Sequence, residues 1–170
     1  MSLDDTLTAS EDAHRAIWDA FHGPATSLGP KTVLLFSYTT LALEHNDAIM
    51  LLVRNGLFGS ALALARPVIE IMWHAGWANA FASNDQIEEI LNGRFRFPKA
   101  WHVVKALDKH YQTGDFFREI HRTSWDPLNS FTHSGRHQLL ARFTEADFAP
   151  SYPEELKIRA VTSSLTARRA

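Results

Sequence analysis

Three side chains that can bind anions or exchange protons recur at four-residue steps in one apolar segment: Arg66, Glu70 and His74. Residues four positions apart lie on the same face of a helix, so we expect these three to form one polar row. An unpaired charge buried in an apolar helix is costly. The row therefore predicts either a polar site inside a helical bundle or an Arg–Glu pair that fixes helix packing. Glu44, in the preceding apolar segment, is expected to approach this row and to contribute to binding.

A glutamate that faces Glu and His on a neighbouring helix is also found in di-metal carboxylate bundles. Those proteins carry Glu-x-x-His on two helices. Here three residues separate Glu70 from His74, and the pattern occurs once. The spacing therefore does not favour a di-iron centre, and no metal or other cofactor is expected.

A second polar segment covers residues 129–137, with the sequence NSFTHSGRH. A histidine can act as acid or base near neutral pH, and Asn129 lies one helical turn before His133. Arg136 adds a charged donor fork. His133 and His137 would lie one turn apart in a continuous helix, a feasible spacing for two zinc ligands, but no third ligand is nearby. Catalysis or anion binding is therefore the chemistry expected here, with local capping of the helix end by His133 as the alternative.

Residues 129–133 match part of the motif of HEPN domains, which is arginine, a polar residue, three further residues and histidine. Asn129 and His133 fill the polar and histidine positions, and Leu128 stands where the motif has arginine. In these residues the chain resembles HEPN domains, a resemblance that implies a compact helical bundle. Many HEPN domains are dimeric ribonucleases of toxin–antitoxin, phage-defence and CRISPR systems, in which the arginine and the histidine act on RNA at the dimer interface.

The chain is also similar to bacterial helical families of unknown function, over roughly residues 30–140. In those families a helix hairpin carries Arg-x-x-x-Glu, here Arg66 to Glu70. A Thr-His-Ser-Gly segment comes much later in the chain, here residues 132–135.

The leucine at position 128 leaves two functional hypotheses. The first is a non-catalytic interaction or regulatory module of a toxin–antitoxin or phage-defence system, which works through a dimer surface and a protein partner encoded nearby.

The alternative hypothesis is a metal-independent endoribonuclease that binds and cuts RNA. His133 would then serve as acid/base and Asn129 as a positioning residue. The charge on the phosphate would be stabilised by Arg136 or Arg122, and Arg66 is a third arginine that could replace the missing one in space.

The formal net charge of −2 is unevenly distributed. Residues 1–93 hold 4 Lys/Arg against 11 Asp/Glu, whereas residues 94–142 hold 9 against 4 and contain five of the nine histidines. A basic block on an otherwise acidic chain indicates where an anionic partner would bind. The block coincides with the segment that contains His133.

Helical periodicity dominates the chain, and the apparent alternation at residues 94–97 stops at Pro98. We expect one all-α domain over residues 1–170, a helical bundle built on a long antiparallel helix hairpin. The expected helices cover about residues 3–22, 31–55, 60–81, 84–91, 98–112, 115–122 and 124–135, with a last one from 153 onward.

Composition excludes further classes of protein. The chain has no cysteine, which excludes disulfides, thiol catalysis and thiolate metal sites. Residues 1–10 lack the features of a signal peptide, and charged residues interrupt both long apolar segments, so we expect a cytoplasmic protein without membrane spans. The five tryptophans and the apolar helices favour a homodimer.

Overall fold

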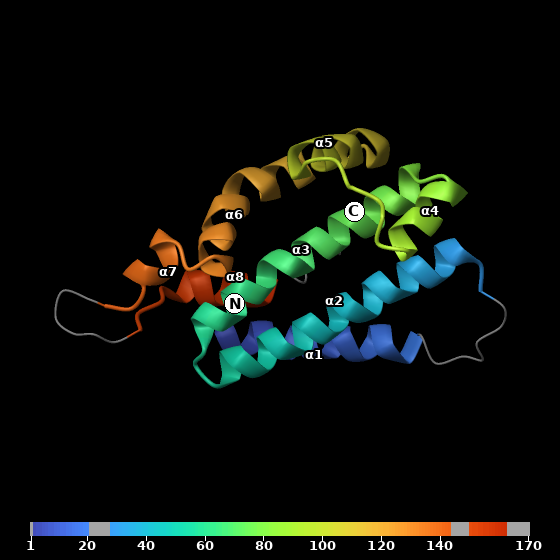
Figure 1. The fold of residues 1–170 in the computed structure, drawn as a ribbon. Coiled ribbons are helices and arrows are strands. Elements are labelled where there is room, and N and C mark those ends of the chain that lie inside the picture. The colour runs from blue at the N-terminus through green and yellow to red at the C-terminus, as the bar shows by residue number, and fades with distance from the viewer. Residues whose placement is uncertain (1, 21–27, 144–149, 163–170) are drawn as a thin grey trace.

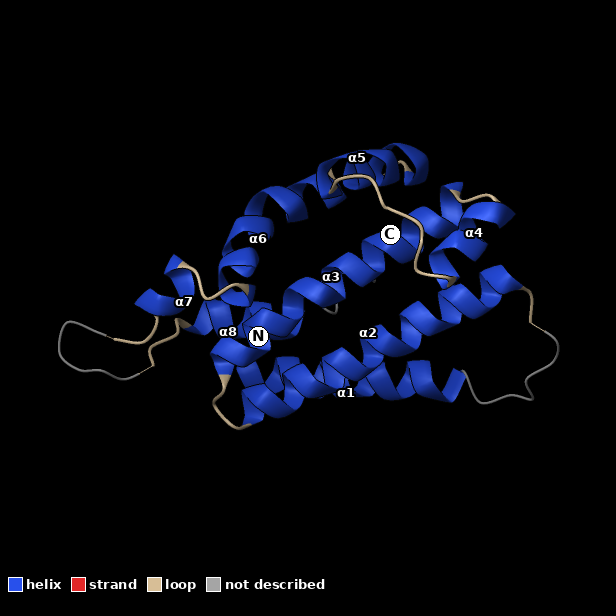
Figure 2. Cartoon of the chain, in the orientation of Figure 1, coloured by secondary structure: helices blue, strands red, loops and turns tan. Residues whose placement is uncertain are grey.

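In a computed structural model, the chain is described at residues 2–20, 28–143 and 150–162. The prediction of an all-α bundle is confirmed, because these ranges form eight helices and no strand (Figures 1 and 2). The helices are α1 (Leu3–Ala20), α2 (Pro30–Arg54), α3 (Phe58–Phe81), α4 (Asn84–Leu91), α5 (Ala100–Tyr111), α6 (Phe116–Thr132), α7 (Arg136–Leu140) and α8 (Glu154–Thr162).

The two longest helices, α2 and α3, form the predicted antiparallel hairpin (Figure 1). Pro30 occupies the first turn of α2, where its missing N–H has no intrahelical partner to lose. At the other end, Gly56 has φ +71°, the left-handed conformation that glycine adopts without steric cost. The chain can therefore reverse within residues 55–57 and begin α3.

The main core lies where α3 packs against α2, α5, α6 and α8. Its fully buried side chains include Ile49, Leu62, Val68, Val103, Leu107 and Val161. α1 packs against α8, and its side chains also contact α2. In the described parts of the chain, no helix has both the length and the apolarity that a bilayer crossing requires.

The sequence predicts two helices between residues 115 and 135, but the structure has one, α6, with Ser124 and Pro127 inside it. The prediction of a helix start at Ser124 is wrong. The actual start is capped by Asp108 of α5, whose carboxylate accepts hydrogen bonds from the backbone N–H groups of Phe117 and Arg118. A cap supplied by another helix leaves no local signal in the sequence.

The helix predicted at residues 84–91 has these bounds in the structure, whereas the start of the next helix shifts. Ser83 caps α4 through a reciprocal capping box with Gln86. Pro98 precedes α5 instead of opening it. The predicted ends at residue 22 and beyond residue 162 lie outside the described residues.

Candidate functional site

The side chain of Arg66 on α3 lies at the centre of a polar cluster between α3 and α6. Its Nη1 is 3.2 Å from Nε2 of His133, 67 positions later in the chain. Its Nη2 donates to Oε1 of Glu70 at 3.3 Å, and its guanidinium carbon lies 4.7 Å from the centroid of the Trp125 ring. We call Arg66, Glu70, Trp125 and His133 the Arg66 site.

The end of α6 is held on α3 at the position where a proline interrupts the hydrogen bonding of α3. Pro67 has no N–H, so the carbonyl of Ala63, four residues earlier, loses its helical donor. The hydroxyl oxygen of Thr132 lies 3.3 Å from that carbonyl oxygen and 2.9 Å from the carbonyl oxygen of Leu128. This contact anchors the residue that immediately precedes His133.

His133 caps the C-terminus of α6, and its side chain is exposed. The next residue, Ser134, has φ +54°, and the chain then turns sharply. A Cβ at Gly135 would lie 2.6 Å from Oγ of Ser130, so only glycine fits this turn without displacing that side chain. His137 lies in the separate helix α7. The prediction that His133 and His137 could share one continuous helix is therefore wrong.

The geometry assigns chemical roles to the two principal side chains. An arginine side chain only donates hydrogen bonds, so Nε2 of His133 accepts and the ring proton of the neutral imidazole lies on Nδ1. The Nε of Arg66 is buried and has no hydrogen-bond partner among the described residues. An exposed imidazole next to a guanidinium can exchange a proton with a bound molecule while the guanidinium binds its negative charge.

Aromatic rings support the Arg66 site from α6. Trp125 stacks on Trp73 and on His121, with ring centroids 5.3 Å apart in both pairs. Burial lowers the pKa of His121, and the nearby charge of Asp126 opposes that effect only in part. The stack holds the indole ring that lies under Arg66.

The sequence predicts no role at this site for Trp125 or His121. A signal for Trp125 is nevertheless present, because residues 125, 129 and 133 are spaced four apart and share one face of α6.

A cleft of about 490 Å³ adjoins the Arg66 site, with Glu70, Trp73 and Trp125 in its lining. Arg96 and Lys99 lie at the same cleft; both are exposed, and neither forms an ion pair within the described ranges. The basic block therefore contributes two available cations beside the site.

His74, the third member of the predicted polar row, also lines this cleft, and its ring stacks on Phe97 with centroids 3.8 Å apart. Its burial lowers its pKa.

No hydrogen bond between described residues joins either of the other predicted arginines to the side chain of His133. Arg122 donates two hydrogen bonds to Glu119, and its side chain is 71% exposed. At 1.5 Å per residue, the eleven positions between residues 122 and 133 of α6 correspond to about 16 Å. Arg136 is exposed at the start of α7 and forms no ion pair in the described part of the chain. Of the three candidate arginines, the structure brings Arg66 to the histidine.

Two further predicted site residues are not joined to the cluster. Glu44 is exposed on α2, and no hydrogen bond or ion pair between described residues connects it to Arg66 or Glu70. Asn129 accepts the backbone N–H of His133 through its own backbone carbonyl. Leu128, at the position of the motif arginine, is buried in the core at 6% exposure.

The described residues contain no group of three or more His, Asp or Glu side chains arranged to hold a metal ion.

Comparison with known proteins gives one family match. A family model described as a family of unknown function, DUF6988, matches residues 39–166. The matched range contains all four residues of the Arg66 site and begins within α2. No significant match was found among curated proteins or solved structures.

Proposed function

We propose that this chain, which belongs to the family of unknown function DUF6988, is a metal-independent endoribonuclease that reacts at Arg66 and His133. The observation that carries the proposal is the 3.2 Å contact between the guanidinium of Arg66 and the imidazole of His133. This contact places an arginine beside the histidine although residue 128 is leucine. The proposed function therefore uses Arg66 in place of Arg122 or Arg136.

The proposed reaction uses the 2′-hydroxyl of RNA as the nucleophile. When RNA binds, its phosphate oxygens accept the hydrogen bonds of Arg66 and free Nε2 of His133. Nε2 then accepts the proton of that hydroxyl, and the 2′-oxygen attacks the adjacent phosphorus. The bond from phosphorus to the 5′-oxygen breaks, and the proton taken by His133 passes to that oxygen. The products are a 2′,3′-cyclic phosphate and a 5′-hydroxyl. The guanidinium of Arg66 binds the phosphate oxygens and stabilises the charge that builds up on them.

The surroundings of the site support RNA as the substrate. Arg96 and Lys99 beside the adjoining cleft can bind neighbouring phosphates. Trp101 is 46% exposed and contacts His121 edge to face, and such a ring can stack a base of single-stranded RNA.

The test is cleavage of single-stranded RNA by the purified chain in the presence of EDTA. We expect products with 2′,3′-cyclic phosphate ends, and we expect His133→Ala and Arg66→Ala to cut about 10²- to 10⁴-fold more slowly. Both variants should keep the helical circular dichroism of the parent. His137→Ala and Arg122→Ala are matched controls that remove an exposed histidine and an exposed arginine outside the Arg66 site, and they should cut normally. No cleavage by the parent chain, or equal cleavage by His133→Ala, would show that the proposal is wrong.

A second candidate function is the non-catalytic interaction module, and one surface favours it. Leu139, Leu140 and Phe143 are 59%, 47% and 46% exposed, respectively, and come soon after His133 in the chain. Exposed apolar residues gathered in this way are typical of a protein–protein interface. A second copy of the chain, or a protein encoded nearby in a toxin–antitoxin or phage-defence system, would bind there.

Sedimentation and co-purification distinguish this second function from the first. As a module, the chain would form a homodimer or retain the product of a neighbouring gene, and Leu139→Asp with Leu140→Asp would abolish that association. RNA would then stay uncut. A monomer at micromolar concentration that binds no neighbouring gene product would exclude the module.

A further inference from the structure

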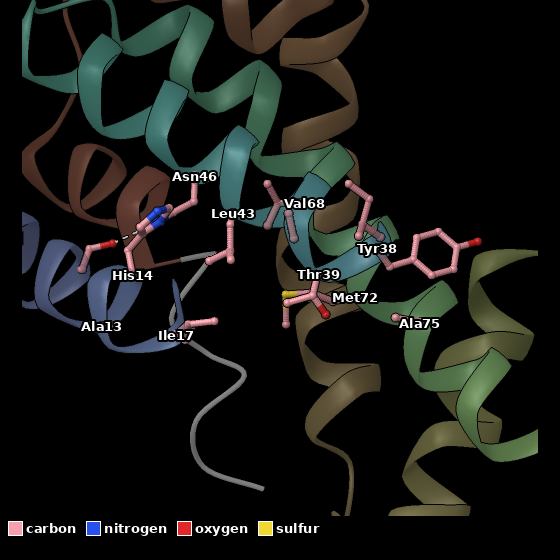
Figure 3. A pocket seen from close by; sticks show the side chains of 13 residues that line it. Ala13, His14, Ile17, Tyr38, Thr39, Leu43, Asn46, Val68, Met72 and Ala75 are labelled. Atoms are coloured by element: carbon pink, nitrogen blue, oxygen red, sulfur yellow. Dashed lines mark hydrogen bonds between the residues drawn. The ribbon is translucent and has the colours of Figure 1, made fainter. Parts of the chain in front are cut away.

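A pocket of about 200 Å³ lies between α1 and the α2–α3 hairpin (Figure 3). Its α3 wall is formed by Val68, Ile71, Met72 and Ala75. At 3.6 residues per turn, these positions lie on the face of α3 opposite Arg66 and Glu70. The pocket is therefore separate from the Arg66 site, and a ligand bound in it does not depend on the proposed function.

Most of the pocket wall is apolar. In addition to the α3 side chains, Ala13 and Ile17 of α1 and Leu43 of α2 line it (Figure 3). His14 and Asn46 lie at one end and Tyr38 and Ala75 at the other. A molecule in this pocket would find one polar end and an apolar body.

The polar end contains two buried atoms that lack hydrogen-bond partners. Asn46 is 7% exposed; its Nδ2 donates to Oγ of Ser10 at 3.4 Å, and its Oδ1 has no partner among the described residues. His14 approaches Oδ2 of Asp47 through Nε2 at 3.2 Å, and its Nδ1 is likewise buried without a partner in the described part of the chain.

Both unpartnered atoms are hydrogen-bond acceptors when the ring of His14 is neutral. The amide of Asn46 uses its nitrogen for Ser10, which leaves the carbonyl oxygen. Because the carboxylate of Asp47 only accepts, Nε2 of His14 carries a proton, and in the neutral ring Nδ1 then has a free lone pair. Each buried acceptor without a donor costs about 1–3 kcal/mol, and buried polar atoms are rarely left in that condition. A ligand that brings a hydrogen-bond donor into the pocket would satisfy these acceptors.

We propose that this pocket binds a small apolar molecule that carries a hydroxyl or an N–H group at one end. The donor contacts Oδ1 of Asn46 and Nδ1 of His14, and the apolar body packs on Leu43, Val68 and Met72. The volume suits a ligand of one or two rings, since an apolar cavity of about 150 Å³ accepts benzene.

The test uses indole and indene, two probes of nearly equal shape, of which indole alone has an N–H donor. Each is titrated into the full chain by calorimetry and by thermal unfolding. We expect indole to bind and to raise the Tm, and indene to bind about five- to tenfold more weakly, which is the contribution of one hydrogen bond.

Two variants complete the test. Asn46→Leu replaces the acceptor with an apolar side chain of similar size, so the preference for indole over indene should disappear. Asn79→Leu makes the same substitution on α3 at an exposed position outside the pocket and should keep the preference. Should Asn46→Leu fail to fold, Ala75→Leu narrows the opposite end and should weaken both probes. The proposal would be overturned if indole did not bind the parent chain at millimolar concentration, or if a folded Asn46→Leu variant kept the preference for indole. The two acceptors would then be hydrogen-bonded to water.

Discussion

The hydroxyl of Thr132 occupies the place of the hydrogen-bond donor that Pro67 removes from α3. Its oxygen lies 3.3 Å from the carbonyl oxygen of Ala63, the group that an N–H at position 67 would otherwise reach. The carbonyl that loses its partner in α3 thus becomes the point at which α6 binds to α3. The neighbours of these residues, Arg66 and His133, are brought together as a result.

Thr132→Val should lower the free energy of unfolding by about 1 kcal/mol, because valine keeps the shape of threonine and loses its donor. The loss should be smaller in a Pro67→Ala background, where the new N–H can reach the Ala63 carbonyl. Urea unfolding of the two single variants and the double variant measures this coupling. Thr123→Val is the matched control, since the hydroxyl of Thr123 forms its hydrogen bonds within its own helix. Equal losses in both backgrounds would contradict the compensation.

Under the proposed function, Arg66→Lys should lose most RNA cleavage, about 10²- to 10³-fold. Lysine keeps the positive charge, but one ammonium group cannot lie flat over Trp125 while it contacts both Glu70 and His133. Initial rates under single-turnover conditions measure the effect. Arg122→Lys should cut at the parental rate. If Arg66→Lys also cuts at the parental rate, the reaction needs a positive charge at position 66 but not the planar guanidinium.

Asp108→Ala should destabilise the fold by about 1–3 kcal/mol, because it leaves the first N–H groups of α6 and Nε of Arg118 without their acceptor, while Arg118 keeps its ion pair with Asp115. Burial raises the pKa of this carboxyl, but hydrogen bonds from Thr113, Phe117 and Arg118 together outweigh it, and the net pKa is lowered from the ordinary value of 3.8. The carboxylate therefore contributes stability that is present above pH 3.8 and is lost as the pH falls through its folded pKa. Chemical unfolding from pH 6 to pH 3 should show this loss in the parent, and a smaller pH dependence in Asp108→Asn.

The stability of the fold should also fall between pH 7.5 and pH 5.5. Burial lowers the pKa of His74 from its ordinary value of 6.5, so over this range the unfolded chain binds more protons than the folded one. Stability then rises with pH and is lost as the pH drops below 6.5. His74→Gln removes the titrating ring and should reduce the pH slope of the unfolding free energy. His121, whose pKa is lowered mainly by burial, contributes with the same sign, so the double variant should be flatter still. If the unfolding free energy of both variants depends on pH as steeply as that of the parent, His74 and His121 are not the cause of the pH dependence.

The periodic parts of the fold could be predicted from the sequence. Apolar spacing predicts the α2–α3 hairpin, and the four-residue step predicts the pair of Arg66 and Glu70, because both depend on neighbours along one helix. The continuity of α6 could not be predicted, since its cap, Asp108, comes from another helix. Ser124 and Pro127 meanwhile resemble a helix start.

The candidate site could be predicted only in its parts. Arg66 and His133 are both recognisable as chemically capable, yet nothing local to either indicates that they meet, since 67 positions separate them. Their meeting depends on how α6 crosses α3. Leu128 is a core position at 6% exposure, and its burial depends on the same packing of α6.

The separation of Arg66 and His133 along the sequence also affects when the Arg66 site forms during synthesis of the chain. A ribosome that has translated α2 and α3 has already made Arg66, Glu70 and the proline that prepares the docking point, but not the histidine. The pair forms only when synthesis has passed residue 133 and α6 has folded back onto α3. An unfinished chain therefore carries half of the Arg66 site, and a chemistry that needs both halves begins only with tertiary folding.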